Sequence, residues 1–288
     1  MKTGINFNQI IILSSLDKEE ADTAGDLHKF IESERIENNL NFETLLKPFE
    51  SANDLENILS NIEENSRKGA RPIIQIECHG DISEGLELTN GSTLSWDRLE
   101  QLLLPINVST RFNLLVGIAA CFGGHFIGKM VPTNPCPCWA VVAPAKEVDP
   151  GQVISGFRKF YGTLLRTKSI NEAQNALKSA EGTWFLNNAE QWYLEITKHY
   201  LNTYHTPKIM RSRVAQIHKK LKDEEKPQSM SFIKKELIKL NRIDLMEVFF
   251  NDYFSTKAIP ENIERFSSLK QKIERQIDNL KENGTHWV

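Results

Sequence analysis

A histidine and a cysteine each follow directly after an apolar stretch of the chain. His79 and Gly80 come at the end of PIIQIECHGD, and Cys121 comes after the apolar part of NLLVGIAACFGG, 42 residues beyond the histidine. Both stretches have the short, Ile/Val/Leu-rich composition of buried parallel strands. Because the carboxyl ends of neighbouring parallel strands meet at one edge of a sheet, we expect the imidazole and the thiol to lie close together.

A cysteine and a histidine in this arrangement would suit nucleophilic attack on a carbonyl carbon. Gly123–Gly124 and a short helix follow Cys121, and the positive end of a helix favours the thiolate, which is the attacking form. In peptide hydrolysis, the backbone N–H groups of Cys121 and Gly80 would form the oxyanion hole, and His79 would protonate the departing amine. Water would then hydrolyse the acyl-enzyme. Glycine beside each reactive residue would let a substrate backbone approach closely.

Alternation of apolar runs with amphipathic stretches predicts an α/β fold with a mostly parallel central sheet. Strands are expected at 9–15, 41–49, 71–78, 112–120 and 138–144. Helices are expected at about 17–36, 52–68, 95–104 and 123–130. Asp149 and Pro150 predict the start of a further helix. Ser169 and Glu172 have the spacing of a capping box at the start of another.

The chain changes character at about residue 184. We expect a sheet domain over residues 1–183 and a helical region over residues 184–288, because no convincing strand run follows residue 183. The final helix would bury an apolar stripe against the domain or a partner and would stop at Gly284. That stripe consists of Ile263, Phe266, Leu269, Ile273, Ile277 and Leu280.

Charge is distributed unevenly along the chain, whose net charge is -3. Residues 207–288 hold 17 basic and 12 acidic side chains, whereas residues 1–206 hold 18 basic and 26 acidic ones. A basic tail of this kind suits a solvated helical face, and it also suits a surface that binds a polyanion.

The composition is that of an ordinary soluble globular protein, with 40% hydrophobic and 25% charged residues among 288. The longest apolar run near the start, Ile10 to Leu13, is too short for a signal peptide and precedes the acidic DKEEAD. We therefore expect a cytoplasmic protein without a membrane span. Four cysteines are too few for a disulfide framework, so free thiols are predicted at Cys78, Cys121, Cys136 and Cys138.

The two strand ends resemble those of the caspase-like (clan CD) cysteine peptidase superfamily. Ala120-Cys121-Phe122-Gly123 is close to the caspase pattern Q-A-C-[RQG]-G, and the histidine lies at a similar distance upstream. Within the superfamily, the strand, acidic turn and helix with an aromatic pair in residues 140–180 resemble the CHAT domains of bacterial caspase-like proteins and of relatives of separase. The resemblance covers about residues 8–180.

The resemblance implies a caspase-like three-layer α/β/α sandwich and a regulated cysteine endopeptidase with a His79–Cys121 dyad, without metal or cofactor. A specific protein substrate, and a regulatory protein bound through the C-terminal helices, would be its partners. Neither a membrane nor nucleic acid is expected. Bacterial antiviral defence or cell death is the context that such proteins suggest.

Cleavage specificity is not carried over with the resemblance. Ala119 stands two residues before the nucleophile, where metacaspases have an aspartate and caspases a glutamine. An acidic side chain near the site could instead contact a basic substrate residue, or could merely be a solvated loop residue. The candidates for substrate binding are Asp81, Glu84, Ala119 and Asp149.

Three other interpretations remain open. Zinc could be held by soft ligands at an atypical spacing, namely Cys121, His125, Cys136 and Cys138. CFGGHFIG could bind a nucleotide, but it lacks the first glycine of the dinucleotide fingerprint, and the chain has no Walker lysine. The fold could also be a non-catalytic interaction module that recruits a partner through the basic tail. Cys78 is expected to be a small buried side chain on the opposite face of its strand from His79.

Overall fold

The computed structural model describes residues 5–204, 206–240 and 249–282. The chain forms two compact units, of which the first comprises Met1–Met130 and Cys136–Ala189, and the second comprises Val131–Pro135 and Glu190–Val288. The first unit holds the sheet and the second is helical.

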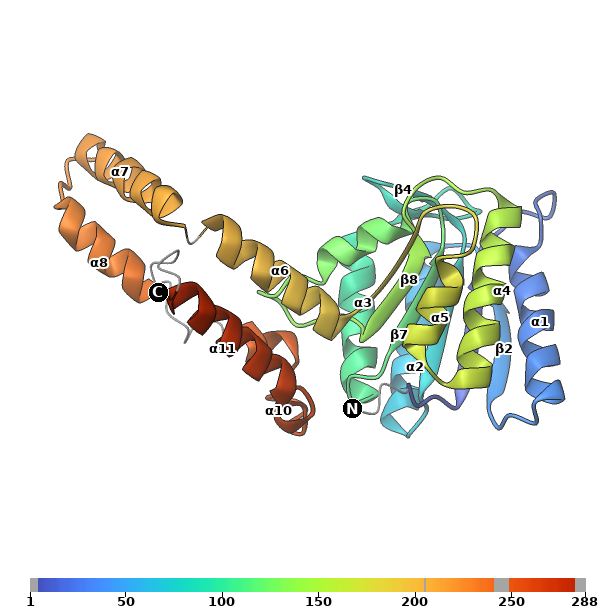
Figure 1. Cartoon of the computed structure of the whole chain (residues 1–288). Coiled ribbons are helices and arrows are strands. Elements are labelled where there is room, and N and C mark those ends of the chain that lie inside the picture. Colours follow the sequence, from blue (N-terminus) through green and yellow to red (C-terminus); the bar gives the residue numbers. More distant parts are fainter. Residues whose placement is uncertain (1–4, 205, 241–248, 283–288) are drawn as a thin grey trace. The chain divides into compact units, whose positions relative to one another are not determined.

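A six-stranded sheet forms the centre of the first unit, in the order β2-β1-β3-β7-β8-β9 (Figure 1). Its strands are β1 (Gln9–Ser14), β2 (Glu43–Pro48), β3 (Pro72–Glu77), β7 (Leu115–Ala119), β8 (Ala140–Pro144) and β9 (Trp184–Asn188). All neighbours are parallel except β8 and β9. Every residue of β3, β7 and β8 is buried, as expected for continuous apolar strands covered on both faces. The α/β class and the five predicted strands are confirmed.

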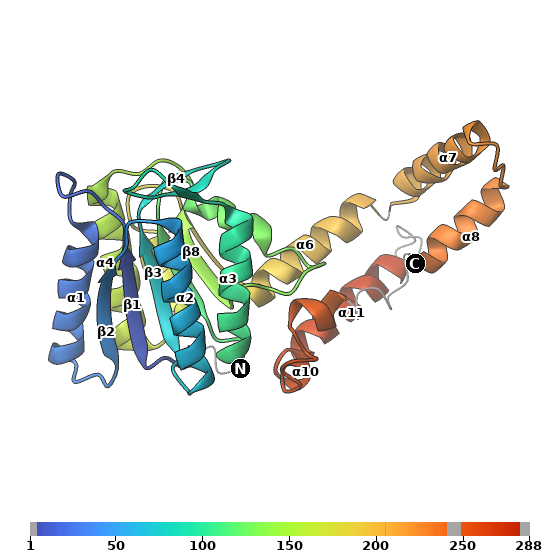
Figure 2. The same ribbon diagram turned by 180° about the vertical axis from the view of Figure 1, so that it is seen from behind.

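Helices cover both faces of this sheet (Figures 1 and 2). One face carries α1 (Thr23–Glu37), α4 (Pro150–Thr167) and α5 (Ile170–Leu177), and the other carries α2 (Ala52–Arg67) and α3 (Trp96–Ser109). From β1 the chain moves outward to β2, whereas from β3 it moves the opposite way to β7. The sheet therefore has a topological switch point between β1 and β3, and ligands of open α/β sheets bind at the carboxyl edge there.

Two helix starts were predicted correctly from capping residues. The Asp149 side chain accepts a hydrogen bond from the N–H of Gln152, which completes a capping box at the start of α4. Ser169 caps α5 by accepting from the N–H of Glu172. The segment predicted as a helix at 123–130 is instead a short 3-10 helix, η1 (Gly123–Lys129).

The prediction that no strand follows residue 183 was wrong, because β9 completes the sheet on the far side of β8. The first unit consequently extends to Ala189, beyond the boundary expected at 183. Only Leu186 and Asn188 of β9 are buried, so this edge strand lacks the continuous apolar run of the inner strands. Phe185 of β9 packs closely against Gly124, because a Cβ built on that glycine would lie 2.4 Å from the Phe185 ring.

A second, three-stranded sheet follows β3 and was also not predicted. It consists of β4 (His79–Asp81), β5 (Gly85–Glu87) and β6 (Thr93–Leu94), paired antiparallel in that order. Strands of two or three residues are too short to produce a periodic sequence pattern.

The second unit is helical. It contains α6 (Ala189–Tyr204), α7 (Pro207–Asp223), α8 (Met230–Leu240), α10 (Asn262–Arg265) and α11 (Ser267–Glu282). One apolar cluster joins α7 and α8 through Met210, Val214, Ile233 and Leu237. An aromatic cluster is formed by Tyr193, Phe250, Tyr253, Phe254 and Phe266.

The predicted apolar stripe of the last helix is largely buried. Phe266, Leu269, Ile273 and Ile277 are buried, whereas Ile263 is 58% exposed and does not belong to the stripe. The side chain of Leu280 and the predicted stop at Gly284 lie outside the described residues.

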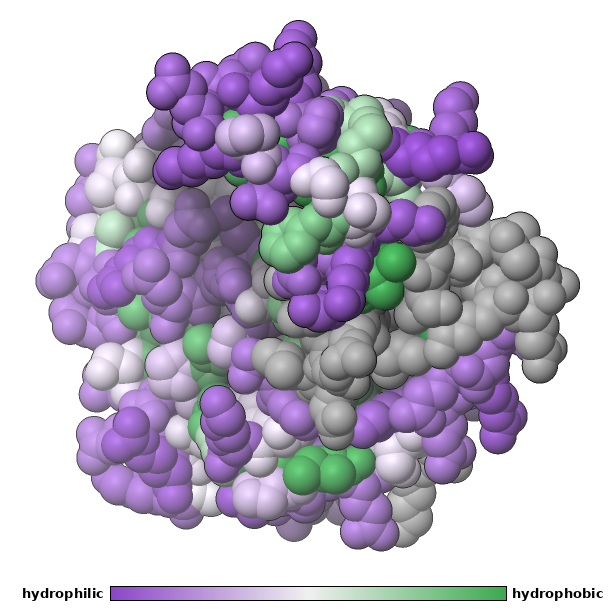
Figure 3. Space-filling view, turned by 90° about the vertical axis from the view of Figure 1, so that its left-hand side faces the viewer, coloured by the Kyte–Doolittle hydropathy of each residue, from purple (hydrophilic) through white to green (hydrophobic). Residues whose placement is uncertain are grey.

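Hydrophilic residues predominate on the face shown in Figure 3, and hydrophobic residues form small separate patches there. None of the helices in the described ranges combines the length and hydropathy that a membrane span requires. All four cysteines are free thiols, as predicted.

Candidate active site

The ends of three neighbouring strands bring together the residues of the site. Glu77, the last residue of β3, pairs in register with Ser14 of β1 and with Ala119 of β7. Beyond the strands, the N–H of Ser15 donates to the carbonyl of Glu77 at 2.8 Å, and the N–H of Cys78 donates to that of Ala119 at 3.4 Å. The segments that follow β1, β3 and β7 thus start side by side at the switch point of the sheet.

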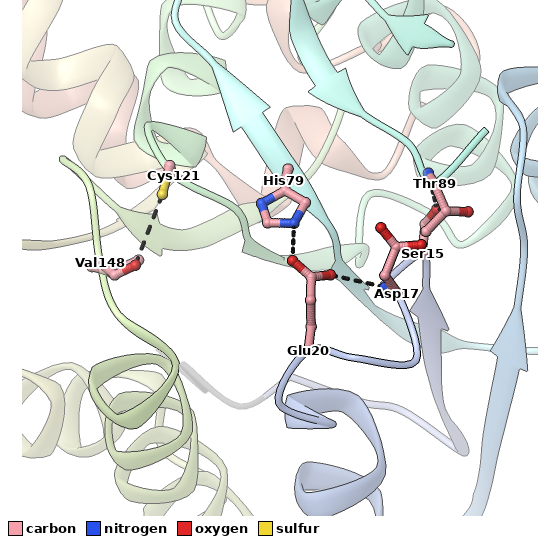
Figure 4. Close-up of polar contacts among 7 residues, drawn as sticks. All are labelled: Ser15, Asp17, Glu20, His79, Thr89, Cys121 and Val148. Atoms are coloured by element: carbon pink, nitrogen blue, oxygen red, sulfur yellow. Dashed lines mark hydrogen bonds and ion pairs between the residues drawn. The ribbon is translucent and has the colours of Figure 1, made fainter. Parts of the chain in front are cut away.

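His79 and Cys121 both lie at this edge of the sheet, and Figure 4 draws the two side chains with their polar partners, Glu20 and Val148. Gly80 packs directly against the nucleophile segment: a Cβ at position 80 would lie 2.7 Å from the carbonyl oxygen of Cys121 and 3.0 Å from the Cβ of Ala120. Any side chain here would force the two strand ends apart. Gly80 is therefore needed for the approach of two protein segments, whereas the sequence had suggested only the approach of a substrate.

The imidazole of His79 has a carboxylate partner. Its Nε2 lies 2.6 Å from Oε1 of Glu20, whose Oε2 accepts the backbone N–H of Asp17 at 2.8 Å. The pKa of Glu20 is lowered chiefly by that backbone N–H and further by the hydrogen bond to His79. In Figure 4 the ring stands directly above the Glu20 carboxylate, and the Cys121 side chain is drawn to one side of it. A carboxylate in this position orients the ring and stabilises the imidazolium when a proton is gained.

Cys121 is presented by a sharp turn. The next residue, Phe122, has a left-handed backbone with φ 59° and ψ 14°, and the N–H of Gly123 donates back to the carbonyl of Ala120 at 3.0 Å. The thiol is half-buried and donates to the carbonyl of Val148 at 3.9 Å. The chain therefore leaves the sheet abruptly after β7 and leaves the sulfur accessible.

Cys78 has the opposite character. It is buried, as the sequence predicted, and burial, followed by the charges of Glu77 and Glu87, raises the pKa of its thiol. A thiol held in its protonated form is a poor nucleophile. Of the two cysteines at these strand ends, only Cys121 has the accessibility that attack on a substrate needs.

The candidate substrate-binding residues differ in their surroundings. Asp81 accepts the N–H groups of Ser83 and Glu84, which lower its pKa, and so closes the turn between β4 and β5. Asp149 caps α4. Both carboxylates serve the local backbone, while Glu84 is exposed and Ala119 is buried at the end of β7.

The proposed zinc ligands do not form a metal site. Among the described residues, no three side chains of His, Cys, Asp or Glu come together in a group that could hold a metal ion. Cys136 and Cys138 are buried, and the thiol of Cys136 donates to the carbonyl of Cys138 at 3.1 Å.

Glu20 is the functional candidate that sequence reasoning missed. It lies in DKEEAD, directly after the first predicted strand, and that position alone places it at the same edge as His79. Which of the neighbouring acidic residues reaches the imidazole depends on the path of the loop before α1, which the sequence pattern does not specify.

Comparison with models of known protein families and with curated proteins finds no match to this chain.

Proposed function

We propose that the protein is a cysteine endopeptidase with a caspase-like three-layer fold, acting in the cytoplasm on one or a few protein substrates. One observation carries the proposal: the accessible thiol of Cys121 lies at a strand end beside His79, whose ring is paired with Glu20. A nucleophile, a base and a group that orients the base are the parts that thiol-dependent acyl transfer requires.

The first half of the reaction forms an acyl-enzyme. His79 accepts the proton of the Cys121 thiol, and the thiolate attacks the carbonyl carbon of the scissile peptide. The backbone N–H groups of Cys121 and Gly80 are the proposed donors to the oxyanion. When the tetrahedral intermediate collapses, the imidazolium protonates the departing amine, and a thioester to Cys121 remains.

The second half regenerates the enzyme. His79 removes a proton from a water molecule that attacks the thioester carbonyl, and the carboxyl product leaves as the thiol regains its proton. Glu20 stabilises the imidazolium each time it forms, because its carboxylate is 2.6 Å from Nε2.

Regulation belongs to the same proposal. A cytoplasmic endopeptidase needs control, and the C-terminal helices are the proposed binding region for a regulatory protein. Defence against viruses or cell death in bacteria is the proposed setting, in keeping with the resemblance to CHAT domains.

A thiol-reactive peptide probe tests this function. Acyloxymethyl-ketone peptides with mixed side chains before the scissile position would be incubated with wild type, Cys121→Ala, His79→Ala and the matched control Cys78→Ala. We expect labelling of wild type and of Cys78→Ala, with loss of labelling in the other two. Equal labelling of wild type and Cys121→Ala would overturn the assignment.

Hydrolysis is then read from a peptide library by mass spectrometry. Cleavage by wild type that is lost in His79→Ala would support the peptidase and define its preferred residue. Identical digests from the two proteins would instead favour a non-catalytic interaction module.

A further inference from the structure

Four polar side chains are buried on the face of the sheet that α1 and α4 cover. The hydroxyl of Tyr161 donates to Oε1 of Gln75 at 2.9 Å, and Nε2 of Gln75 donates to Oε1 of Glu77 at 2.7 Å. The hydroxyl of Thr23 donates to Oε2 of Glu77, also at 2.7 Å. Burying polar groups is costly unless they are hydrogen-bonded, and these bonds form one connected chain.

The chain of hydrogen bonds joins the elements that position the site. Thr23 is the first residue of α1, three residues after Glu20. Glu77 is the last residue of β3, two residues before His79, and its carbonyl also accepts the N–H of Ser15. The network thus links the segment that carries the acid to the strand end that carries the imidazole.

The fourth member of the network extends the link to α4. Tyr161 lies within this helix, which begins at Pro150, shortly after the Val148 carbonyl that accepts the Cys121 thiol. The network therefore includes residues of three elements. The helix α1 follows Glu20, β3 precedes His79, and α4 follows Val148, whose carbonyl accepts a hydrogen bond from the Cys121 thiol.

The neighbouring strand leaves room for the network. A Cβ on Gly117 of β7 would lie 1.8 Å from Oε1 of Gln75. Glycine in the interior of a buried strand weakens it, and its presence often marks a close approach. Here the absent side chain is what allows Gln75 to reach both Tyr161 and Glu77.

We propose that Glu77 is a positioning residue, whose carboxyl group fixes the start of α1 against the end of β3 and so sets the His79–Glu20 pair. Its effect on catalysis rests on the proposed function. Its effect on the geometry of the site does not, and can be measured without hydrolysis.

No cation among the residues that the structure describes is found to act on the Glu77 carboxyl group. Burial raises its pKa to about 7, and the carboxylate of Asp22 before α1 acts in the same direction, whereas Thr23 and Gln75 oppose the shift. The other titratable neighbours are the hydroxyl of Tyr161 from α4 and the thiol of Cys78, both of which feel the Glu77 charge. The network is therefore neutral in mildly acidic solution and gains a buried charge as the pH passes neutrality.

The sign of the linked stability change follows from this shift. An unfolded glutamate releases its proton near its ordinary pKa of 4.5, whereas folded Glu77 keeps its proton until about pH 7. The contribution of Glu77 to stability is thus fully present at low pH, falls between about pH 4.5 and 7, and is constant above. A glutamine at this position does not titrate; its oxygen can accept from Gln75, and its amide nitrogen can donate to the Thr23 hydroxyl in place of the bond that Glu77 accepts there.

Denaturant unfolding from pH 5 to 8 tests the carboxyl group itself. The stability of Glu77→Gln relative to wild type should rise from pH 5 to about pH 7 and then level off, because only wild type must bury a charge at the upper end. The control Glu34→Gln breaks a link between the same two helices, the 2.8 Å ion pair of Glu34 with Arg166, and should show no such rise. A constant difference between Glu77→Gln and wild type would overturn the inference.

Alkylation of Cys121 by iodoacetamide, followed by mass spectrometry across the same pH range, tests positioning. Thr23→Val removes one bond to Glu77 and should change the alkylation rate at least threefold and shift its pH midpoint, while Thr23→Ser, which keeps the hydroxyl, should restore both. Glu34→Gln should leave the profile unchanged. An unaltered profile in Thr23→Val would overturn the positioning role, even if peptide hydrolysis is never observed.

Discussion

The ends of β3 and β7 each carry a cysteine, and the two differ in almost every physical respect. Cys78 continues from β3 toward the hairpin of β4 and β5 and is buried, with a raised pKa. Cys121 stands where the chain turns sharply out of the sheet at Phe122, and its thiol is half-exposed. Both are cysteines just beyond the end of a buried strand, but Cys78 comes one residue after β3 and Cys121 two residues after β7, at the sharp turn, so position and backbone path together decide which thiol can react.

The largest expected difference is the rate of thiol alkylation in the native protein. Iodoacetamide should modify Cys121 at least on the order of 1000-fold faster than Cys78, because a buried thiol reacts only after an opening that costs several kcal/mol. Peptide mapping over time would give both rates. Similar rates under native conditions would remove the contrast between the two strand ends.

Replacement of Gly80 should come next in size. Gly80→Ala places a Cβ 2.7 Å from the Cys121 carbonyl oxygen, so we expect at least a tenfold loss of peptide hydrolysis. We also expect a loss of about 1–3 kcal/mol of unfolding free energy, as is usual for overpacking. Gly128→Ala is the matched control, since nothing lies within 4 Å of a Cβ built there. Equal effects of the two substitutions would show that the close approach is unimportant.

A smaller effect is expected from Glu20→Gln. Loss of a charge-assisted hydrogen bond to His79 should lower kcat/KM by roughly tenfold, which corresponds to about 1.4 kcal/mol. Because the pKa of Glu20 is lowered in the folded protein, its stabilising effect is present above the ordinary glutamate pKa and is lost as the pH falls through the folded value. The difference in unfolding free energy between Glu20→Gln and wild type should therefore become smaller as the pH is lowered.

The exposed neighbour Glu19 provides the control for that experiment. Glu19→Gln removes the same charge from the same loop without touching His79, and kcat/KM should stay within about twofold of wild type. A loss as large as that of Glu20→Gln would show that the net charge of the loop matters more than the pairing.

The smallest expected effect concerns Asp149. Asparagine is as good an N-cap as aspartate, so Asp149→Asn should change the unfolding free energy by no more than about 0.5 kcal/mol, whereas Asp149→Ala should cost about 1 kcal/mol. Denaturant unfolding measures both. If Asp149 only caps α4, peptides with basic side chains are cleaved equally by wild type and Asp149→Asn; a selective loss would assign it to substrate binding.

The sequence was sufficient to predict the strands that build the site. β1, β3, β7 and β8 are rich in Ile, Val, Leu and Ala because both faces of the sheet are covered, and the ends of β3 and β7 place His79 and Cys121 at one edge. β9 was missed because it is an antiparallel edge strand with mixed burial, and β4, β5 and β6 because they are too short for any period to be seen.

Partners that depend on three-dimensional packing were beyond prediction from the sequence. Glu20 reaches His79 only through the course of a loop, and Glu77 finds its partners on α1 and on its own strand, with Tyr161 of α4 behind them. From the sequence, a glutamate at the end of an apolar strand is predicted to be exposed, because the sequence does not show that helices cover it. Its burial is a property of the assembled layers.

The left-handed backbone of Phe122 affects both the stability of the protein and the position of the Cys121 thiol. A non-glycine residue in this conformation costs about 1–2 kcal/mol, and a glycine would relieve that cost. Yet the Phe122 ring packs edge-on against the His125 ring, with the ring centroids 6.1 Å apart, and a glycine would lose that contact. Selection for thermal stability alone would favour glycine at position 122, but the position of the Cys121 thiol would then be less well fixed. The left-handed backbone of Phe122 is thus a loss of unfolding free energy that accompanies a well-fixed nucleophile.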